Sequence, residues 1–82
     1  MPTLDDTRLR RHRQFDWVVG TNIHFLRTNL GLTQADLAQL ADMDPTQLSR
    51  VENGERSLKF RESLAIAHYL GVDPDRLTRV FD

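Results

Sequence analysis

The sequence lacks cysteine, any long apolar run and any glycine-rich phosphate-binding loop. Without cysteine there is no disulfide framework and no Cys-based zinc site, which suits a reducing cytoplasm. No apolar run approaches the length of a membrane-spanning helix, and the N-terminus has charges but no hydrophobic signal core. The 82 residues are enough for one small domain with a single core. We therefore expect a small cytoplasmic protein without membrane association.

Catalytic and metal-binding patterns are also absent. The three histidines are scattered and have no carboxylate, cysteine or ligand spacing around them; they are His12, His24 and His68. Each is better explained as a surface residue than as a ligand or base. We therefore expect no metal, no cofactor and no enzymatic activity.

The most informative stretch is TQADLAQLADMDPTQLSRVENG, from Thr33 to Gly54. Thr33 can cap a first helix over 34–41, whose apolar residues recur at helical spacing. Asp44 and Pro45 then form a cap and a first helical position for a second helix, which should end near Gly54. Because only Asp42 and Met43 remain to turn the chain, the pattern predicts a helix-turn-helix.

The second of these helices has two different faces. Leu48, Val51 and Glu52 fall on one side of a helical wheel, while Thr46, Arg50 and Asn53 fall on the other. Such a polar face is typical of a solvated helix, but it also fits the DNA major groove, where Arg pairs with guanine, amides with adenine and hydroxyls with either. The tight turn before it favours DNA.

These residues resemble the Cro-like phage-repressor family of helix-turn-helix proteins, also called the xenobiotic-response-element family. The resemblance includes the continuation ERSLKFRESLAIAHYLGV and covers roughly residues 19–81. It implies an all-α, lambda-repressor-like fold in which the helix beginning near Pro45 recognises DNA. The chain departs from the family by having Asp42 where glycine is common, so Asp42 must accept a left-handed backbone, which Asp tolerates better than most residues.

The resemblance also implies roles for individual residues. Gln34 and Asn53 match positions that contact DNA phosphates, and the predicted phosphate set is Thr33, Gln34, Asn53, Arg56 and Lys59. Pro45 has no donor at a position where the family often has a polar base-reading residue. The predicted base-reading set is therefore Thr46, Gln47, Ser49 and Arg50, with Pro45 at its start.

The other elements complete a compact five-helix domain. Apolar spacing predicts a first helix from Phe15 to Asn29, a fourth helix capped by Ser57 and ended by Gly71, and a fifth from Pro74 to Phe81. Arg27 lies near the end of the first helix, and a buried Glu52 would need a partner. We predict a structural Arg27–Glu52 ion pair, which the resemblance also implies.

The net charge of −1 is low for a DNA-binding protein. The densest basic run consists of Arg8, Arg10, Arg11 and Arg13 with His12. It is either a solvated segment or an arm or helix extension that reaches phosphates or a minor groove. We therefore divide the chain into this basic segment, 1–14, and a helix-turn-helix domain, 15–82.

The predicted function is sequence-specific binding of double-stranded DNA as a transcriptional regulator, most simply a repressor that occludes a promoter. The alternative is a protein-interaction module, such as an antitoxin-like or bridging factor. We expect a homodimer that pairs through Leu77, Val80 and Phe81, or else through the segment around Leu9 and Trp17. A bacterial or phage origin, with the protein on the nucleoid when bound, follows from the resemblance.

Overall fold

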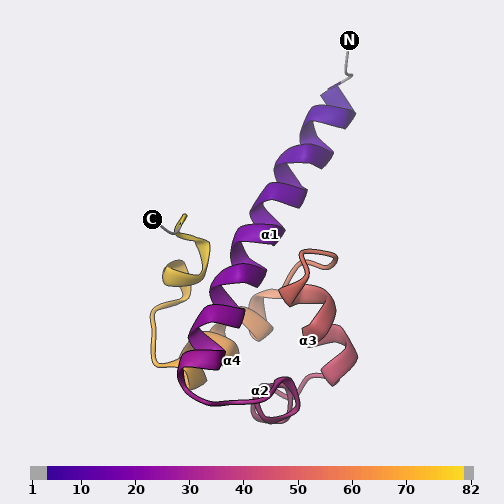
Figure 1. Ribbon diagram of the computed structural model, residues 1–82. Helices are drawn as coiled ribbons and strands as arrows, with labels where there is room; N and C mark the ends of the chain where they lie inside the picture. The colour runs from indigo at the N-terminus through magenta and orange to yellow at the C-terminus, as the bar shows by residue number, and fades with distance from the viewer. Residues whose placement is uncertain (1–3, 81–82) are drawn as a thin grey trace.

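The computed structural model describes residues 4–80, with side chains from His12 to Val80 (Figure 1). The described chain is all-α and contains no strand. Its elements are α1 (Leu4–Asn29), α2 (Gln34–Leu40), α3 (Pro45–Glu52), α4 (Phe60–Leu70) and the 3₁₀ helix η1 (Pro74–Thr78). The all-α class is confirmed, but the predicted fifth α-helix is a short 3₁₀ helix that ends at Thr78. None of the described helices combines the length and apolar character needed to cross a bilayer.

The first helix is longer than predicted, because it begins at Leu4 and not at Phe15. Its N-terminal part extends away from the other helices (Figure 1). The boundary that we placed between residues 14 and 15 therefore lies inside one continuous helix. Apolar periodicity could not locate the true start, since it records only the part of a helix that packs on a core.

The helix ends are formed mostly by the residues that the sequence indicated. The Thr33 hydroxyl accepts the backbone N–H of Asp36 at 3.0 Å, and the Asp44 carboxylate accepts that of Thr46 at 2.8 Å. Asp42 has a φ of 55°, which confirms the predicted left-handed backbone. Ser57 does not cap α4, because its hydroxyl donates to Asp16 at 2.6 Å and the helix starts three residues later.

At the start of α4, Glu62 takes the place of a serine cap. Its carboxylate accepts the backbone N–H of Lys59 at 2.8 Å and both terminal nitrogens of Arg56 at 2.9 and 3.0 Å. Burial raises the pKa of the Glu62 carboxyl, but these hydrogen bonds lower it more, so its pKa lies below the ordinary value. The ion pair thus fixes the loop between α3 and α4.

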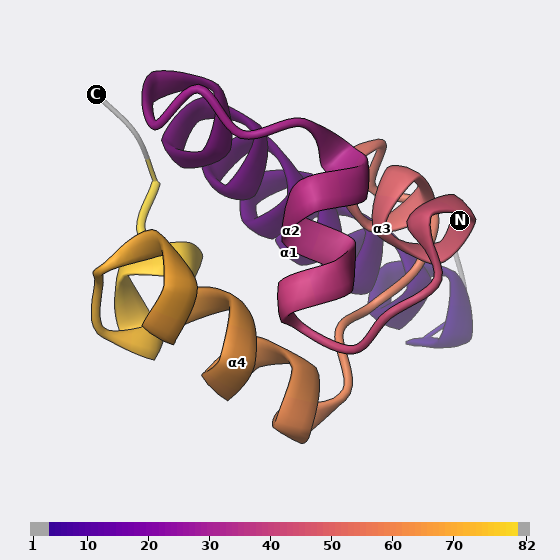
Figure 2. The same cartoon turned by 90° about the horizontal axis from the view of Figure 1, so that it is seen from below.

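The core lies between the C-terminal half of α1 and the other helices. Helices α3 and η1 both contact α1, while α2 contacts α3 and α4. In Figure 2, α2 lies in front of α1, with α3 and α4 on either side of it. The buried apolar residues are Val19, Ile23, Leu37, Ala38, Ala41, Leu48, Val51, Ile66, Ala67, Leu70 and Leu77. Gly20 permits the closest approach, because a Cβ there would lie 2.2 Å from the Val51 carbonyl oxygen. This contact sets the distance between α1 and α3.

The predicted C-terminal apolar stripe does not form as one exposed surface. Leu77 is only 1% exposed and belongs to the core, so it is not available to a second chain. The reason is Asn22, whose amide donates to the carbonyls of Leu77 and Arg79 at 2.8 Å each and draws this segment onto α1. Val80 is exposed, and Phe81 lies outside the described residues.

Candidate nucleic-acid interface

The turn between α2 and α3 presents α3 with one face buried and one face in solvent. Met43 donates its backbone N–H to the carbonyl of Ala38 at 2.8 Å, which closes the turn after the left-handed Asp42. Leu48 and Val51 are then buried against the core. As a result, the opposite face of α3 is held outward by a short, hydrogen-bonded connection.

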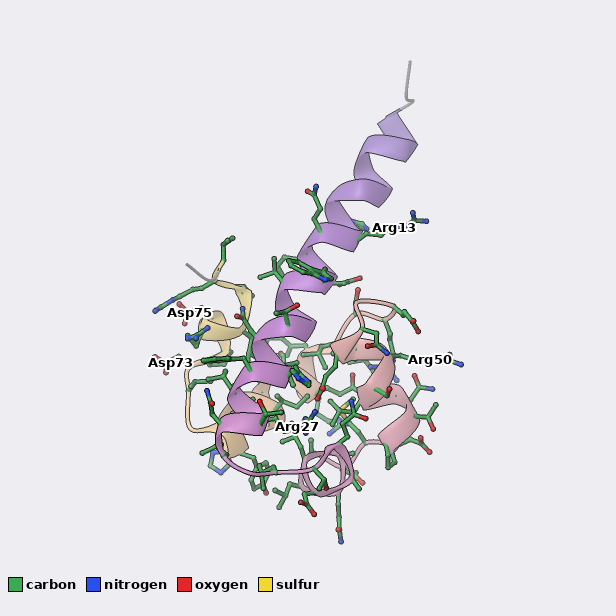
Figure 3. All side chains as sticks on the ribbon, in the orientation of Figure 1. Arg13, Arg27, Arg50, Asp73 and Asp75 are labelled. Carbon is green, nitrogen blue, oxygen red and sulfur yellow. The ribbon has the colours of Figure 1, made fainter. Side chains whose placement is uncertain are left out.

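The outward face carries the predicted base-reading residues. Pro45, Thr46 and Arg50 are exposed, while Gln47 and Ser49 are half-buried. Arg50 extends from α3 away from the body of the protein (Figure 3). This face offers a guanidinium, an amide and two hydroxyls, which are the groups that read base edges in a major groove.

Beneath this face, Glu52 joins α3 to α1 and α2. Arg27 donates to both of its carboxylate oxygens, through Nε at 2.7 Å and Nη2 at 2.9 Å. Gln34 Nε2 donates to Oε1 at 3.1 Å, and His24 Nδ1 lies 3.0 Å from the same oxygen. The predicted partners Arg27 and Glu52 therefore meet, and Arg27 points into the space between the helices in Figure 3.

The charges of this cluster are mutually stabilising. Burial raises the pKa of the Glu52 carboxyl. The hydrogen bonds from Arg27, Gln34 and His24 together lower this pKa by more than burial raises it, so the pKa lies below the ordinary value. The hydrogen bond to Glu52 raises the pKa of Arg27. Arg27 also donates to the carbonyl of Leu32 at 2.7 Å, so one guanidinium orients the loop before α2 as well as α3.

Two of the predicted phosphate contacts lie at one hollow. Gln34, at the start of α2, and Asn53, at the end of α3, line a depression of about 320 Å³ together with Thr21, His24 and Glu52. Sequence reasoning did not place His24 here. Its spacing of three residues from Arg27 was the available signal, because such residues share a helix face.

The remaining predicted phosphate residues differ in their availability. The Thr33 hydroxyl accepts a hydrogen bond within the cap, but it keeps its own hydrogen to donate. Lys59 is exposed. Arg56 is engaged with Glu62 through two nitrogens, so in the free protein it is a structural residue of the loop. Among the described residues no cluster of His, Asp or Glu could hold a metal ion.

The sequence and the fold both match known proteins. A family model described as "Helix-turn-helix", HTH_3, matches residues 23–77. The "HTH-type transcriptional regulator RamB" of Mycobacterium tuberculosis is 36% identical over 55 residues, which are 67% of this chain but 12% of that regulator. The chain thus spans about an eighth of the length of this relative.

Two solved structures have the same arrangement of helices. One is the restriction-modification controller protein C.AhdI from Aeromonas hydrophila, with a TM-score of 0.72 and 32% identity over 76% of this chain and 94% of that one. The other is the hypothetical transcription factor NHTF from Neisseria, with a TM-score of 0.77 and 26% identity over 84% of this chain and 79% of that one. In both cases the match extends beyond the turn to most of the domain.

Proposed function

This chain belongs to the HTH_3 helix-turn-helix family of DNA-binding transcription regulators, and on that premise we propose that it binds a specific double-stranded DNA sequence through α3 and represses transcription by covering a promoter. The observation that carries the proposal is the polar outward face of α3, which the tight turn after α2 holds clear of the core. In this proposal the protein acts in the cytoplasm of a bacterium or a phage-infected cell and is on the nucleoid when bound.

In this proposal the base contacts come from Thr46, Gln47, Ser49 and Arg50, with Pro45 at the edge of the face. Arg50 is the principal reader, because a guanidinium pairs with guanine through two hydrogen bonds. The Arg27–Glu52 pair is structural and keeps α3 at a fixed angle to α1.

The phosphate contacts come from Thr33, Gln34, Asn53 and Lys59. A primary amide has two N–H donors, and Gln34 uses one of them on Glu52. The second donor of Gln34 remains for a phosphate, and Glu52 fixes its direction. Arg56 joins this set only if DNA displaces it from Glu62.

The protein acts as a homodimer in this proposal, since one short helix reads only a few base pairs and a two-fold dimer reads two half-sites about 34 Å apart. One residue of each candidate surface supports a shared site: Trp17 and Val80, together with Phe15, line one hollow of about 480 Å³ between α1 and the C-terminal segment. Val80 is 75% exposed, so Val80→Glu should leave helical content unchanged while light scattering reports a monomer. A Val80→Glu variant that remains dimeric would exclude this surface.

The deciding experiment starts with an anisotropy titration of bulk genomic fragments at two salt concentrations. Binding that weakens steeply with salt supports the proposal, because phosphate contacts release counterions. No binding at low salt would instead support the protein-interaction alternative, which the net charge of −1 favours.

Selection of bound sites from random DNA then separates base contacts from phosphate contacts. Arg50→Ala should lose about 1–3 kcal/mol at the selected site and relax preference at one position, whereas Gln34→Ala should weaken all sequences alike. If Arg50→Ala lowers affinity uniformly and leaves base preference unchanged, Arg50 is a phosphate contact and not a reader.

A further inference from the structure

Helix α1 begins well before the buried core on which its C-terminal half packs. Between His12 and Val18 no side chain is buried, and the first core residue of α1 is Val19. At 1.5 Å per residue, the part from Leu4 to Val18 extends the helix by roughly 22 Å. The buried core therefore does not account for the helical segment from His12 to Val18.

Arg13 belongs to the densest basic run of the sequence. No acidic residue occurs between Thr7 and Phe15, while the run contains four arginines. In Figure 3, Arg13 and Arg50 extend to the same side of the protein, and Asp73 and Asp75 lie on the other side. Arg13 and Arg50 therefore point to one side of the protein, although the net charge of the chain is close to zero.

A direct contact between α1 and the end of α3 places the two arginines near a common point. A Cβ on Gly54 would lie 3.1 Å from the Cα of Trp17, so the two backbones touch there. Arg13 precedes Trp17 by four residues, and Arg50 precedes Gly54 by four. Arg13 is therefore about one helical turn, roughly 6 Å along α1, from this junction. Arg50 lies in the last turn of α3, four residues before the same junction.

We propose that the projecting half of α1 is a second DNA contact, in which Arg13 binds a backbone phosphate beside the groove that α3 enters. The inference rests on the proposed function and adds to it. Phosphates border the major groove along both strands, so a cation just past the end of a recognition helix meets one. A helix holds this cation in place before binding, and less conformational entropy is lost than with an unstructured arm.

Arg13→Gln tests the proposal, with Arg79→Gln as the matched control. Glutamine is nearly as good a helix former as arginine, so α1 should persist. Arg79 is also exposed, but it lies 3.5 Å from Asp75, on the side away from Arg50. Both variants remove one positive charge, and therefore any difference between them reports position and not net charge.

The measurement is the salt dependence of affinity for a mixed-sequence DNA duplex, by anisotropy. Loss of one phosphate contact lowers the slope of log K against log salt by about 0.9 per bound chain. The affinity advantage of the wild type over Arg13→Gln should then shrink about 3.5-fold per chain between about 50 and 200 mM salt. Arg79→Gln should keep the wild-type slope, and all three proteins should have the same circular-dichroism melt.

The outcomes separate the two proposals. If the wild type binds DNA and Arg13→Gln has the wild-type slope, the second contact is refuted and the proposed function stands. An equal change in both variants also refutes it, since the effect is then one of net charge. If the wild type does not bind DNA at low salt, the proposed function fails and the second contact fails with it.

Discussion

Gly20→Ala should destabilise the fold, although alanine favours helices. Gly20 lies within α1 where this helix crosses the end of α3. An added Cβ would be 2.2 Å from the Val51 carbonyl oxygen and 2.7 Å from that of Glu52. Ordinary contacts of this kind are longer by about 1 Å or more, and both oxygens belong to backbone. The two helices must therefore move apart, because no side chain can turn aside.

The magnitude follows from two opposing effects. Replacing glycine by alanine in a helix gains up to about 1 kcal/mol. Forcing an extra carbon into a packed site costs about 1–3 kcal/mol or more, and the rigid neighbours here favour the upper end. We expect a net loss of about 2 kcal/mol in the free energy of unfolding. For a domain of this size that lowers Tm by about 8–16 °C.

Thermal and urea unfolding followed by circular dichroism measure this loss. Gly31→Ala is the control, because Gly31 has a φ of +73° but no atom within 4 Å of an added Cβ. The control loses stability through backbone strain alone and should keep its DNA affinity when folded. Gly20→Ala should lose affinity even at low temperature, since separating the helices turns α3. A Gly20→Ala variant as stable as the wild type would refute the argument that close approach fixes the α1–α3 distance.

Three further predictions concern the charged cluster and the turn. Breaking the buried pair by Glu52→Gln or Arg27→Met should cost about 3–5 kcal/mol each, and the double variant less than the sum; strictly additive losses in thermal melts would mean that the side chains do not interact. Because the pKa of Glu52 is lowered on folding, its contribution is fully present above the ordinary value of 4.5 and is lost as pH falls through the lower folded value. Urea titrations should therefore show stability falling below about pH 5, and a smaller fall in Glu52→Gln; an equal fall in both would assign the effect to other carboxyls. At the turn, Asp42→Val should lower Tm and Asp42→Gly should not, since Asp42 has a φ of 55° and valine is strained there; equal melts would contradict this account.

Local chemistry was sufficient to predict the helix-turn-helix. Thr33, Asp44 and Pro45 determine where α2 and α3 begin, because a cap acts on backbone groups only two or three residues away. The left-handed Asp42 and the Arg27–Glu52 pair were also accessible to sequence reasoning. The first follows from the resemblance, since the family often has glycine where this chain has Asp42, and the second from the cost of burying a lone carboxylate.

Other features depend on contacts between residues far apart in the sequence. Leu77 looked like part of an exposed stripe, yet Asn22 bonds to its carbonyl across 55 positions and draws it into the core. Ser57 was predicted to cap α4, but its hydroxyl donates to the Asp16 carboxylate, and Glu62 caps the helix instead. In the same way Gly20 matters only because α3 crosses it. Caps and turns are short-range and can be predicted from neighbouring residues, whereas burial and side-chain pairing depend on which helices meet, and only the tertiary structure decides that.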